Sequence, residues 1–287
     1  MDTKKFLAQE NEKIKLSDFE TDYTGKIKSK QEAEELLEAN IVKMRELQSK
    51  LYADDKYSVL LVFQAMDAAG KDGMIKRVMS GLNPQGTQVF SFKQPSAEEI
   101  DHGYLWRIHK AAPERGRIGI FNRSHYEDVL VVRVHNYLKS SKVPEAMIGK
   151  NIWQKRFEQI NNFEKYFYEN GTIILKFFLH ISKEEQKKRF ISRIDDTSKN
   201  WKFSKADIEE RKYWDEYQKC YEDAINNTSK KHSPWYVIPS DKKWFARLLV
   251  SEIIVESMKN LNLSYPKLSD EQLKELQNCK TMLMNEK

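Results

Sequence analysis

Residues 59–76, VLLVFQAMDAAGKDGMIK, contain a continuous apolar run followed by a glycine, a lysine and an amphipathic segment. The run 59–63 is bounded by polar residues, as is typical of a buried strand in a parallel sheet. Gly70 and Lys71 then begin a predicted helix over 71–82, which ends near Gly81 and Pro84. The stretch therefore predicts a strand–loop–helix unit whose first helical turn offers unpaired N–H groups to an anion.

The loop departs from the usual phosphate-binding pattern G-x-x-x-x-G-K-[ST] in an informative way. Ala65 replaces the first glycine and Asp72 replaces the hydroxyl residue, while Asp67 adds a second carboxylate. Carboxylates repel phosphate unless a divalent metal lies between them, so the loop is predicted to bind metal-bridged phosphate. The predicted phosphate contacts are Ala68, Ala69, Gly70, Lys71, Asp72 and Gly73. The alternative is an ordinary strand–turn–helix unit with surface aspartates.

Strands and helices are predicted to alternate along the rest of the chain. Further strands are expected at 88–92, 117–121, 172–179 and 236–238, and helices at 30–53, 96–110 and 242–261. This alternation predicts an α/β fold with a parallel sheet of about five strands covered on both faces. Ligands of such sheets bind beyond the carboxyl ends of the strands. Residues 1–28 are expected to form a polar, weakly structured arm, and residues 269–284 a packing or subunit-contact helix.

The strand 117–121 is followed by Asn122-Arg123-Ser124-His125-Tyr126-Glu127-Asp128. An acid is expected at this strand end to hold Mg²⁺, but Asn122 is not one. Asp128 is the better metal candidate, and Arg123 and Arg133 are candidate phosphate ligands, Arg133 with a surface arginine as the alternative. His125 has no evident partner in the sequence, so we expect it to be structural or to contact substrate.

Residues 183–217 form a basic segment in which Arg189 and Arg193 are four residues apart and share one helix face. Arginine-rich helices that close over phosphates neutralise transition-state charge and exclude water. Because this segment follows a phosphate loop and a strand, we interpret it as a lid. A solvated helical hairpin is the alternative.

Composition sets limits on what the protein does. The chain has 287 residues, a net charge of +6 and two cysteines without a CxxC pair or histidine cluster, so neither a disulfide framework nor structural zinc is expected. The start lacks the apolar stretch of a secretory leader, and no apolar run is long enough to cross a membrane. We therefore expect a cytoplasmic protein without a membrane partner. The small excess of positive charge suits a polyanionic ligand without arguing for nucleic acid.

Several separated motifs together resemble the polyphosphate kinase 2 family. These motifs are AMDAAGKDG, SFKQPSAEEIDHGYLWR, FNRSHYEDVLVVRVH and KKRFISR…NWKFS…WDEY, in this order over roughly residues 30–263. The resemblance implies a three-layer αβα P-loop kinase fold like that of thymidylate kinase, with a helical lid at about 183–217. It implies a kinase domain over 29–264 between the arm 1–28 and a helical tail 265–287. It also implies a phosphotransferase that uses inorganic polyphosphate and Mg²⁺ (or Mn²⁺) to phosphorylate nucleotides, reversibly in some members.

The resemblance also assigns residues to roles. Asp67 and Asp128 match the acids of two Walker-like motifs and would position metal and phosphate, with Lys71 and Arg123 taking up developing charge. The remaining matches are predicted to bind phosphate or polyphosphate: Gly70 and Asp72 in the loop, Arg133 after the second motif, and Arg189, Arg193 and Lys202 in the lid. Asn at position 122 is similar to the subgroup of the family that accepts both nucleoside mono- and diphosphates. The resemblance therefore implies AMP, ADP, GMP and GDP as acceptors. Homodimers or homotetramers are implied as well.

Two rival functions predict different features. An ATP-dependent nucleotide kinase of thymidylate-kinase type predicts the usual GK[ST] ending, which Asp72 contradicts. A nucleotide- or nucleic-acid-binding module without catalysis would explain the positive charge but not two acids beside a phosphate loop.

Overall fold

Six strands form the central sheet in the part of the chain that the structure describes. The computed structural model describes residues 1–286, with Ser140 described by its backbone alone. The strands are β1 (Leu7–Ala8), β2 (Ser58–Ala65), β3 (Thr87–Ser91), β4 (Ile118–Asn122), β5 (Thr172–His180) and β6 (Trp235–Pro239). Their order in the sheet is β1-β6-β5-β2-β4-β3, and all neighbours are parallel except β1 and β6. The five strands expected from the sequence are confirmed, and β1 is an addition.

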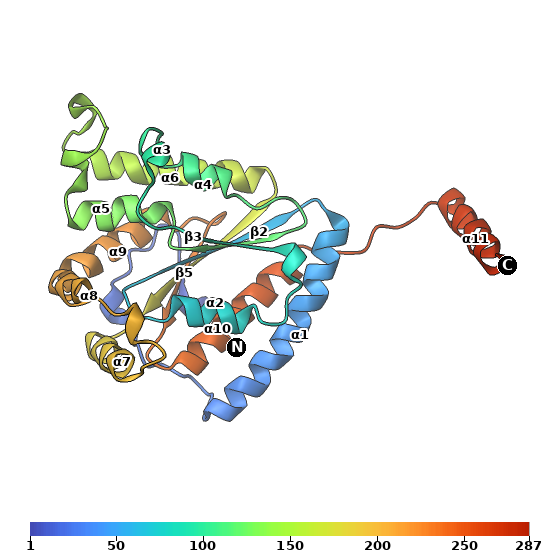
Figure 1. The fold of residues 1–287 in the computed structure, drawn as a ribbon, viewed down its shortest axis with the longest axis horizontal. Helices are drawn as coiled ribbons and strands as arrows, with labels where there is room; N and C mark the ends of the chain where they lie inside the picture. The colour runs from blue at the N-terminus through green and yellow to red at the C-terminus, as the bar shows by residue number, and fades with distance from the viewer. Residues whose placement is uncertain (287) are drawn as a thin grey trace.

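Helices cover both faces of this sheet. The helices are α1 (Lys30–Asp54), α2 (Lys71–Val78), α3 (Ala97–Ile100), α4 (Trp106–Lys110), α5 (Val131–Val134), α6 (Ile152–Glu169), α7 (Lys183–Asp195), α8 (Lys205–Glu210), α9 (Trp214–Thr228), α10 (Lys243–Lys259) and α11 (Asp270–Met284). Short 3-10 helices are η1 (Lys4–Phe6), η2 (Leu16–Asp18), η3 (Pro84–Gly86), η4 (His125–Val129), η5 (Tyr137–Ser140), η6 (Glu145–Met147), η7 (Asn200–Lys202) and η8 (Arg211–Tyr213). In Figure 1, α1, α2 and α10 lie on one side of the sheet and α5, α6 and α9 on the other. The predicted three-layer αβα architecture is confirmed.

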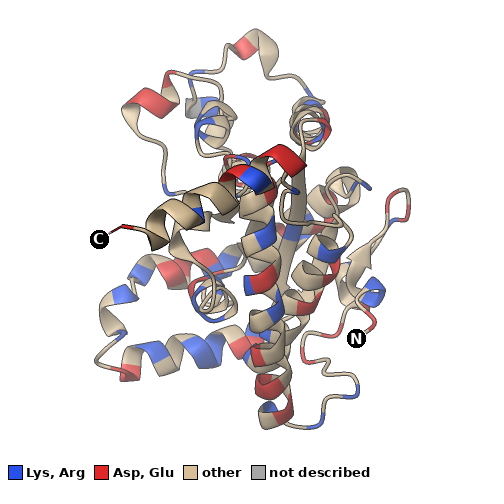
Figure 2. Cartoon of the chain, turned by 90° about the vertical axis from the view of Figure 1, so that its right-hand side faces the viewer, with Lys and Arg blue, Asp and Glu red and all other residues tan. Residues whose placement is uncertain are grey.

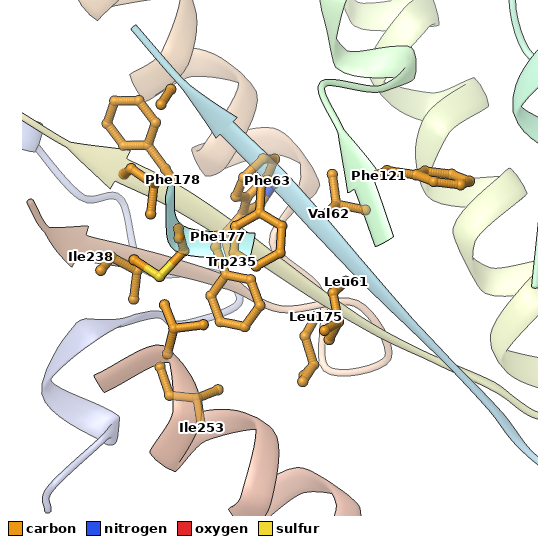
Figure 3. Close-up of a cluster of buried hydrophobic side chains, with 14 of the residues drawn as sticks. Leu61, Val62, Phe63, Phe121, Leu175, Phe177, Phe178, Trp235, Ile238 and Ile253 are labelled. Atoms are coloured by element: carbon orange, nitrogen blue, oxygen red, sulfur yellow. The ribbon is translucent and has the colours of Figure 1, made fainter. Parts of the chain in front are cut away.

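The core lies between these layers. All eight residues of β2 are buried, which explains why its sequence is apolar without alternation. Phe63 of β2 stacks on Phe177 of β5 with ring centroids 5.1 Å apart, and Ile253 of α10 packs below them (Figure 3). Burying side chains of this size contributes roughly 1.5–3 kcal/mol each. The site at the strand ends therefore rests on a rigid support.

The N-terminal arm is more ordered than the sequence predicts. Leu7 and Ala8 pair antiparallel with β6, and the Phe6 side chain is buried beside Tyr23 and Phe245. The expectation of a weakly structured arm is wrong, because a few apolar residues spaced along a polar segment are enough to anchor it at the edge of the sheet.

The prediction of a single helix over 96–110 is also wrong, because the chain forms the two helices α3 and α4 instead. Ser96 and Glu99 make a reciprocal capping box that begins α3, and the helix ends at Ile100. Gly103, which disfavours helix, lies between the two helices. The helix α2 likewise ends at Val78, before the predicted boundary near Gly81.

The C-terminal helix α11 stands apart from the rest of the protein, at the end of an extended segment (Figure 1). Ser269 caps it through a box with Gln272. Basic and acidic residues are interspersed along the helices (Figure 2). Within residues 1–286, no helix combines the length and the apolar character needed to cross a membrane.

Candidate active site

The loop between β2 and α2 carries two left-handed residues. The φ of Ala68 is 58° and that of Gly70 is 105°. Gly70 tolerates this conformation because it has no Cβ, whereas at Ala68 it costs energy that the surrounding structure must supply. The loop therefore has a defined, strained shape immediately before the first turn of α2.

Side-chain donors hold this shape by binding the loop carbonyls. The bonds run from Lys71 Nζ to Ala65 O (2.9 Å), from Gln186 Nε2 to Asp67 O (2.8 Å) and from Arg189 Nη1 to Ala69 O (2.6 Å). Because N–H and C=O point in opposite directions across a trans peptide, the N–H groups of Ala68 and Gly70 point away from these donors. Together with the N-terminus of α2, such N–H groups form a nest that suits an anion.

Arg189 makes structural hydrogen bonds that the sequence did not predict. Its guanidinium bonds the carbonyl oxygens of Ser240 (2.5 Å) and Asp241 (3.1 Å) as well as the loop, and its Nε bonds Glu185 (2.9 Å). The side chain is buried, and burial lowers the pKa of Arg189. Arg189 lines the cavity described next, but most of its donors already bind protein, so it fastens α7 to the phosphate loop.

A cavity of about 750 Å³ opens in front of the loop, and we call it the basic cavity. Three aspartates line it, against nine lysines and arginines: Lys71, Lys93, Arg123, Arg189, Arg193, Lys199, Lys202, Lys243 and Arg247. The pKa of Lys243 is lowered by burial and then by the charge of Arg189. Such an excess of one sign focuses a positive potential in the cavity.

Four of these cations were not predicted from the sequence: Lys93, Lys199, Lys243 and Arg247. Lys93 lies in the motif SFKQPS and Lys199 in the predicted lid, so the signal for both was present. Lys243 and Arg247 lie on α10, far along the chain, and no local pattern marks them. They reach the cavity because β6, which precedes α10, ends near the phosphate loop.

The end of β4 lies beside the loop, as its position next to β2 requires. Asn122 Nδ2 donates to Asp72 Oδ1 at 2.9 Å, and Arg123 Nη2 donates to Asp67 Oδ1 at 3.1 Å. Arg123 also lies 3.5 Å from Glu127. Although burial opposes its charge, the carboxylates of Glu127 and Asp67 raise the pKa of Arg123. Two strand ends are thus joined by charged hydrogen bonds.

A smaller cavity of about 320 Å³ adjoins the basic cavity, and we call it the smaller cavity. Its walls include five aromatic side chains: Phe92, His135, Tyr137, Tyr217 and Tyr221. The two cavities share six lining residues: Asp67, Phe92, Lys93, Gln94, Arg123 and Asp207. They therefore meet where the phosphate loop and the end of β4 come together.

Two adjacent carboxylates, Glu127 and Asp128, line the smaller cavity together with Asp67. Burial raises the pKa of Asp128 to about 6, although Arg156 (3.9 Å away) and Arg107 oppose the shift. Burial also raises the pKa of Glu127, a residue that was not predicted from the sequence. Buried carboxylates with raised pKa values are common at functional sites.

This donor set is suited to Mg²⁺. Among residues 1–286, no group of three or more His, Cys, Asp or Glu side chains is placed to hold a metal alone. Mg²⁺, however, usually takes one or two carboxylates and completes its shell with water and substrate phosphates. Asp67 and Asp128, both on the wall of the smaller cavity, fit that requirement.

The segment predicted to be a lid lies over the basic cavity. Arg193 of α7 and Lys202 of η7 line that cavity, and Lys202 Nζ lies 3.8 Å from Asp72 Oδ2. Of the residues predicted from the sequence to bind phosphate or metal, only Asp128 and Arg133 do not line the basic cavity. Asp128 lines the smaller one, whereas Arg133 lines neither and pairs with Asp223 at 2.5 Å.

His125 has the partner that the sequence did not reveal. It is buried, and its Nε2 lies 3.2 Å from Glu164 Oε1. His125 lines neither cavity, which supports the structural role among the two expected for it.

Comparison with known proteins agrees with this architecture. The polyphosphate kinase 2 family model matches residues 27–266. A Rhodopseudomonas palustris protein named ADP-polyphosphate phosphotransferase is 51% identical over 284 residues, with 98% of each chain covered. A Meiothermus ruber protein named AMP/ADP-polyphosphate phosphotransferase is 46% identical over 264 residues, covering 92% of this chain and 95% of its own. The crystal structure of polyphosphate kinase 2 from Arthrobacter aurescens TC1 superposes with a TM-score of 0.86 at 38% identity, over 94% of both chains. On these matches, this chain belongs to the polyphosphate kinase 2 family.

Proposed function

We propose that this protein transfers the terminal phosphoryl group of inorganic polyphosphate to AMP and ADP. The observation that carries the proposal is the meeting of two unlike cavities at Asp67 and Arg123, beside the phosphate loop. A phosphotransferase needs a donor and an acceptor to approach each other at one point. The name of the Rhodopseudomonas palustris relative supports ADP as an acceptor, and the name of the Meiothermus ruber relative supports both AMP and ADP.

The basic cavity suits the polyphosphate donor. Polyphosphate carries about one negative charge per unit and no aromatic group, so it requires cations in a row. Lys199, Lys202 and Arg193 come from the lid, and Lys243 and Arg247 from α10, so positive charge surrounds the cavity on several sides. The phosphate loop lies at one wall of this cavity, where the terminal phosphoryl group would lie.

The smaller cavity suits the nucleotide acceptor. Its aromatic walls offer apolar surface to a base and sugar, and Arg107 and Arg123 offer charge to phosphate. Its volume of about 320 Å³ is at the lower end of the range typical of small-molecule sites. The acceptor phosphate would then point toward Asp67 and Arg123, where the cavities join.

The chemistry requires positioning and charge neutralisation more than covalent catalysis. In the proposed step, an oxygen of the terminal nucleotide phosphate attacks the terminal phosphorus of polyphosphate. The bond from that phosphorus to the bridging oxygen breaks, and the shortened polyphosphate leaves with the electron pair. The N–H groups of the loop, Lys71 and Arg123 would stabilise charge on the transferred group. Closure of the lid would exclude water as a competing acceptor.

Asp67 and Asp128 would hold Mg²⁺ (or Mn²⁺), which when bound neutralises the phosphate oxygens that would otherwise repel each other. The carboxylate of Asp72 sits at the N-terminus of α2 in place of a hydroxyl, hydrogen-bonded to Asn122. This departure from the usual ATP-binding loop supports polyphosphate rather than ATP as the donor.

The test is a phosphotransfer assay with long-chain polyphosphate, Mg²⁺ and AMP, ADP, GMP or GDP, in the absence of ATP. We expect AMP and ADP to be phosphorylated, and the guanine nucleotides show whether the base matters. Transfer only when ATP is the donor would instead identify an ATP-dependent kinase. Binding of nucleotides without any product would identify a binding module and contradict the proposal.

The proposal extends to direction, location and assembly. The same geometry would support polyphosphate synthesis from a nucleoside triphosphate, because the step is chemically reversible. We place the protein in the cytoplasm, where its nucleotide substrates are. Assembly as a homodimer or homotetramer would use α11, which stands apart from the body of the chain (Figure 1) and exposes Leu273 and Leu276. Light scattering would measure the assembly.

A further inference from the structure

A cluster of charged side chains is buried behind the active site. The Lys176 ammonium of β5 lies 2.5 Å from the Glu164 carboxylate of α6, and these side chains are 0% and 1% exposed. The Tyr126 hydroxyl donates to Glu164 Oε1 (2.8 Å) and accepts from Lys176 Nζ (2.8 Å). His125 Nε2 lies 3.2 Å from the same Glu164 oxygen. Four side chains from three elements thus form one network.

Stability alone does not explain this network. A buried ion pair loses hydration that its attraction only partly restores, and replacing both charges by apolar side chains is often neutral or stabilising. Burial lowers the pKa of Lys176 to about 8. Burial alone would raise the pKa of Glu164, but Lys176 and His125 outweigh burial and lower this pKa to about 2. The Lys176–Glu164 pair instead fixes the positions of the side chains that are hydrogen-bonded to it.

The network is attached to one half of η4. His125 and Tyr126 are the first two residues of this 3-10 helix and line neither cavity. The next two residues, Glu127 and Asp128, line the smaller cavity. A five-residue 3-10 helix has few hydrogen bonds of its own, so its rotation depends on its side-chain anchors. Any rotation that His125 and Tyr126 undergo must also move Glu127 and Asp128.

We propose that Lys176 and Glu164 are positioning residues that set, through Tyr126 and His125, the orientation of Glu127 and Asp128 in the smaller cavity. This inference rests on the proposed function, in which that cavity holds the nucleotide acceptor. A displacement of about 1 Å at a reacting group can cost about 100-fold in rate. The phosphate loop, α7 and α10 surround the proposed polyphosphate site. No hydrogen bond described above links these elements to the four side chains of the network.

The test compares three proteins in the phosphotransfer assay. Lys176→Met/Glu164→Met removes both charges together, so neither is left unpaired in the core. Lys165→Met/Glu169→Met makes the same change on the exposed face of α6, where the two side chains lie 3.7 Å apart and are 59% and 61% exposed. The wild type, measured first, tests the proposed function separately, because an inactive wild type would contradict that function.

We expect the buried double variant to stay folded by circular dichroism while its kcat falls about tenfold or more. Its KM for ADP and its ADP dissociation constant, measured by calorimetry without polyphosphate, should rise several-fold. Its KM for polyphosphate should rise less than its KM for ADP, because the displaced carboxylates meet the proposed polyphosphate site only through Arg123, and the exposed double variant should match the wild type. Wild-type kcat and ADP affinity in a folded buried variant would overturn the inference, as would an equal loss of affinity for donor and acceptor.

Tyr126→Phe keeps the test decisive if the double variant does not fold. This change removes one hydroxyl from the network and keeps the ring that packs on Trp235, with centroids 4.7 Å apart. We expect a folded protein with a several-fold lower kcat and weaker ADP binding. Unchanged ADP kinetics and binding would overturn the inference.

Discussion

Arg123 donates a hydrogen bond to the carboxylate of Asp67 over 3.1 Å, and this contact joins the carboxyl ends of β4 and β2. Both residues line both cavities. Their side chains are 41% and 33% exposed, so a phosphate or a metal ion can reach them from either side. The pair marks the point at which donor and acceptor would meet.

Replacing Asp67 tests this meeting point. We expect Asp67→Asn to lower the polyphosphate-dependent rate by about 100-fold or more, because a preorganised charge at the reacting groups is lost. The fold should survive, since the side chain is not part of the core. The rate with saturating Mg²⁺ measures the effect, and Asp101→Asn, at an exposed residue paired with Lys142, is the control. Full activity of Asp67→Asn would show that its assignment to metal is wrong.

Lys202 tests the lid. Its ammonium lies 3.8 Å from Asp72, and polyphosphate oxygens would replace that carboxylate as its partner. Lys202→Ala should therefore raise the KM for polyphosphate several-fold, with the KM for ADP nearly unchanged. The effect should shrink at high salt, which screens exposed charges. Lys187→Ala, at an exposed residue of α7 outside both cavities, should have no such effect.

Arg189 and Arg193 lie one helical turn apart on α7 but should respond differently to the same change. Arg189→Met removes a buried guanidinium that bonds four carbonyl groups, and we expect the free energy of unfolding to fall by about 3 kcal/mol. Arg193→Met should change it by about 0.5 kcal/mol or less and mainly weaken polyphosphate binding. Chemical denaturation and steady-state kinetics separate the two effects. Equal loss of stability in both variants would contradict the distinction.

The Lys176–Glu164 pair predicts a pH dependence of stability. The folded pKa of Glu164, about 2, is below its ordinary value of 4.5, so the folded state binds the proton more weakly than the unfolded state. The resulting stabilisation is fully present above pH about 4.5 and is lost as the pH falls toward 2. In thermal unfolding, the stability of the wild type relative to that of Lys176→Met/Glu164→Met should therefore be lower at pH 3 than at pH 6, whichever of the two proteins is the more stable. A difference that stays constant over this range would contradict the lowered pKa.

Much of the fold could be predicted because its signals are local. The apolar run of β2 and the Gly70-Lys71 junction sit within a few residues of each other, so period and composition were enough to find them. The break between α3 and α4 was missed because it depends on one capping box and one glycine inside an otherwise helical pattern. The edge strand β1 was missed because a strand of two residues is too short to show a hydrophobic periodicity.

The sequence by itself determined the phosphate loop, the five parallel strands and five of the nine lysines and arginines that line the basic cavity, since each of these is marked by its neighbours along the chain. Only the tertiary structure decided which distant side chains join them. The sheet order places β4 and β5 on either side of β2, although they lie far apart along the chain. That arrangement brings Arg247 of α10 to the basic cavity, commits Arg133 to Asp223, and connects Glu127 and Asp128 to a buried lysine. Contacts of this kind depend on packing between layers, which no local pattern records.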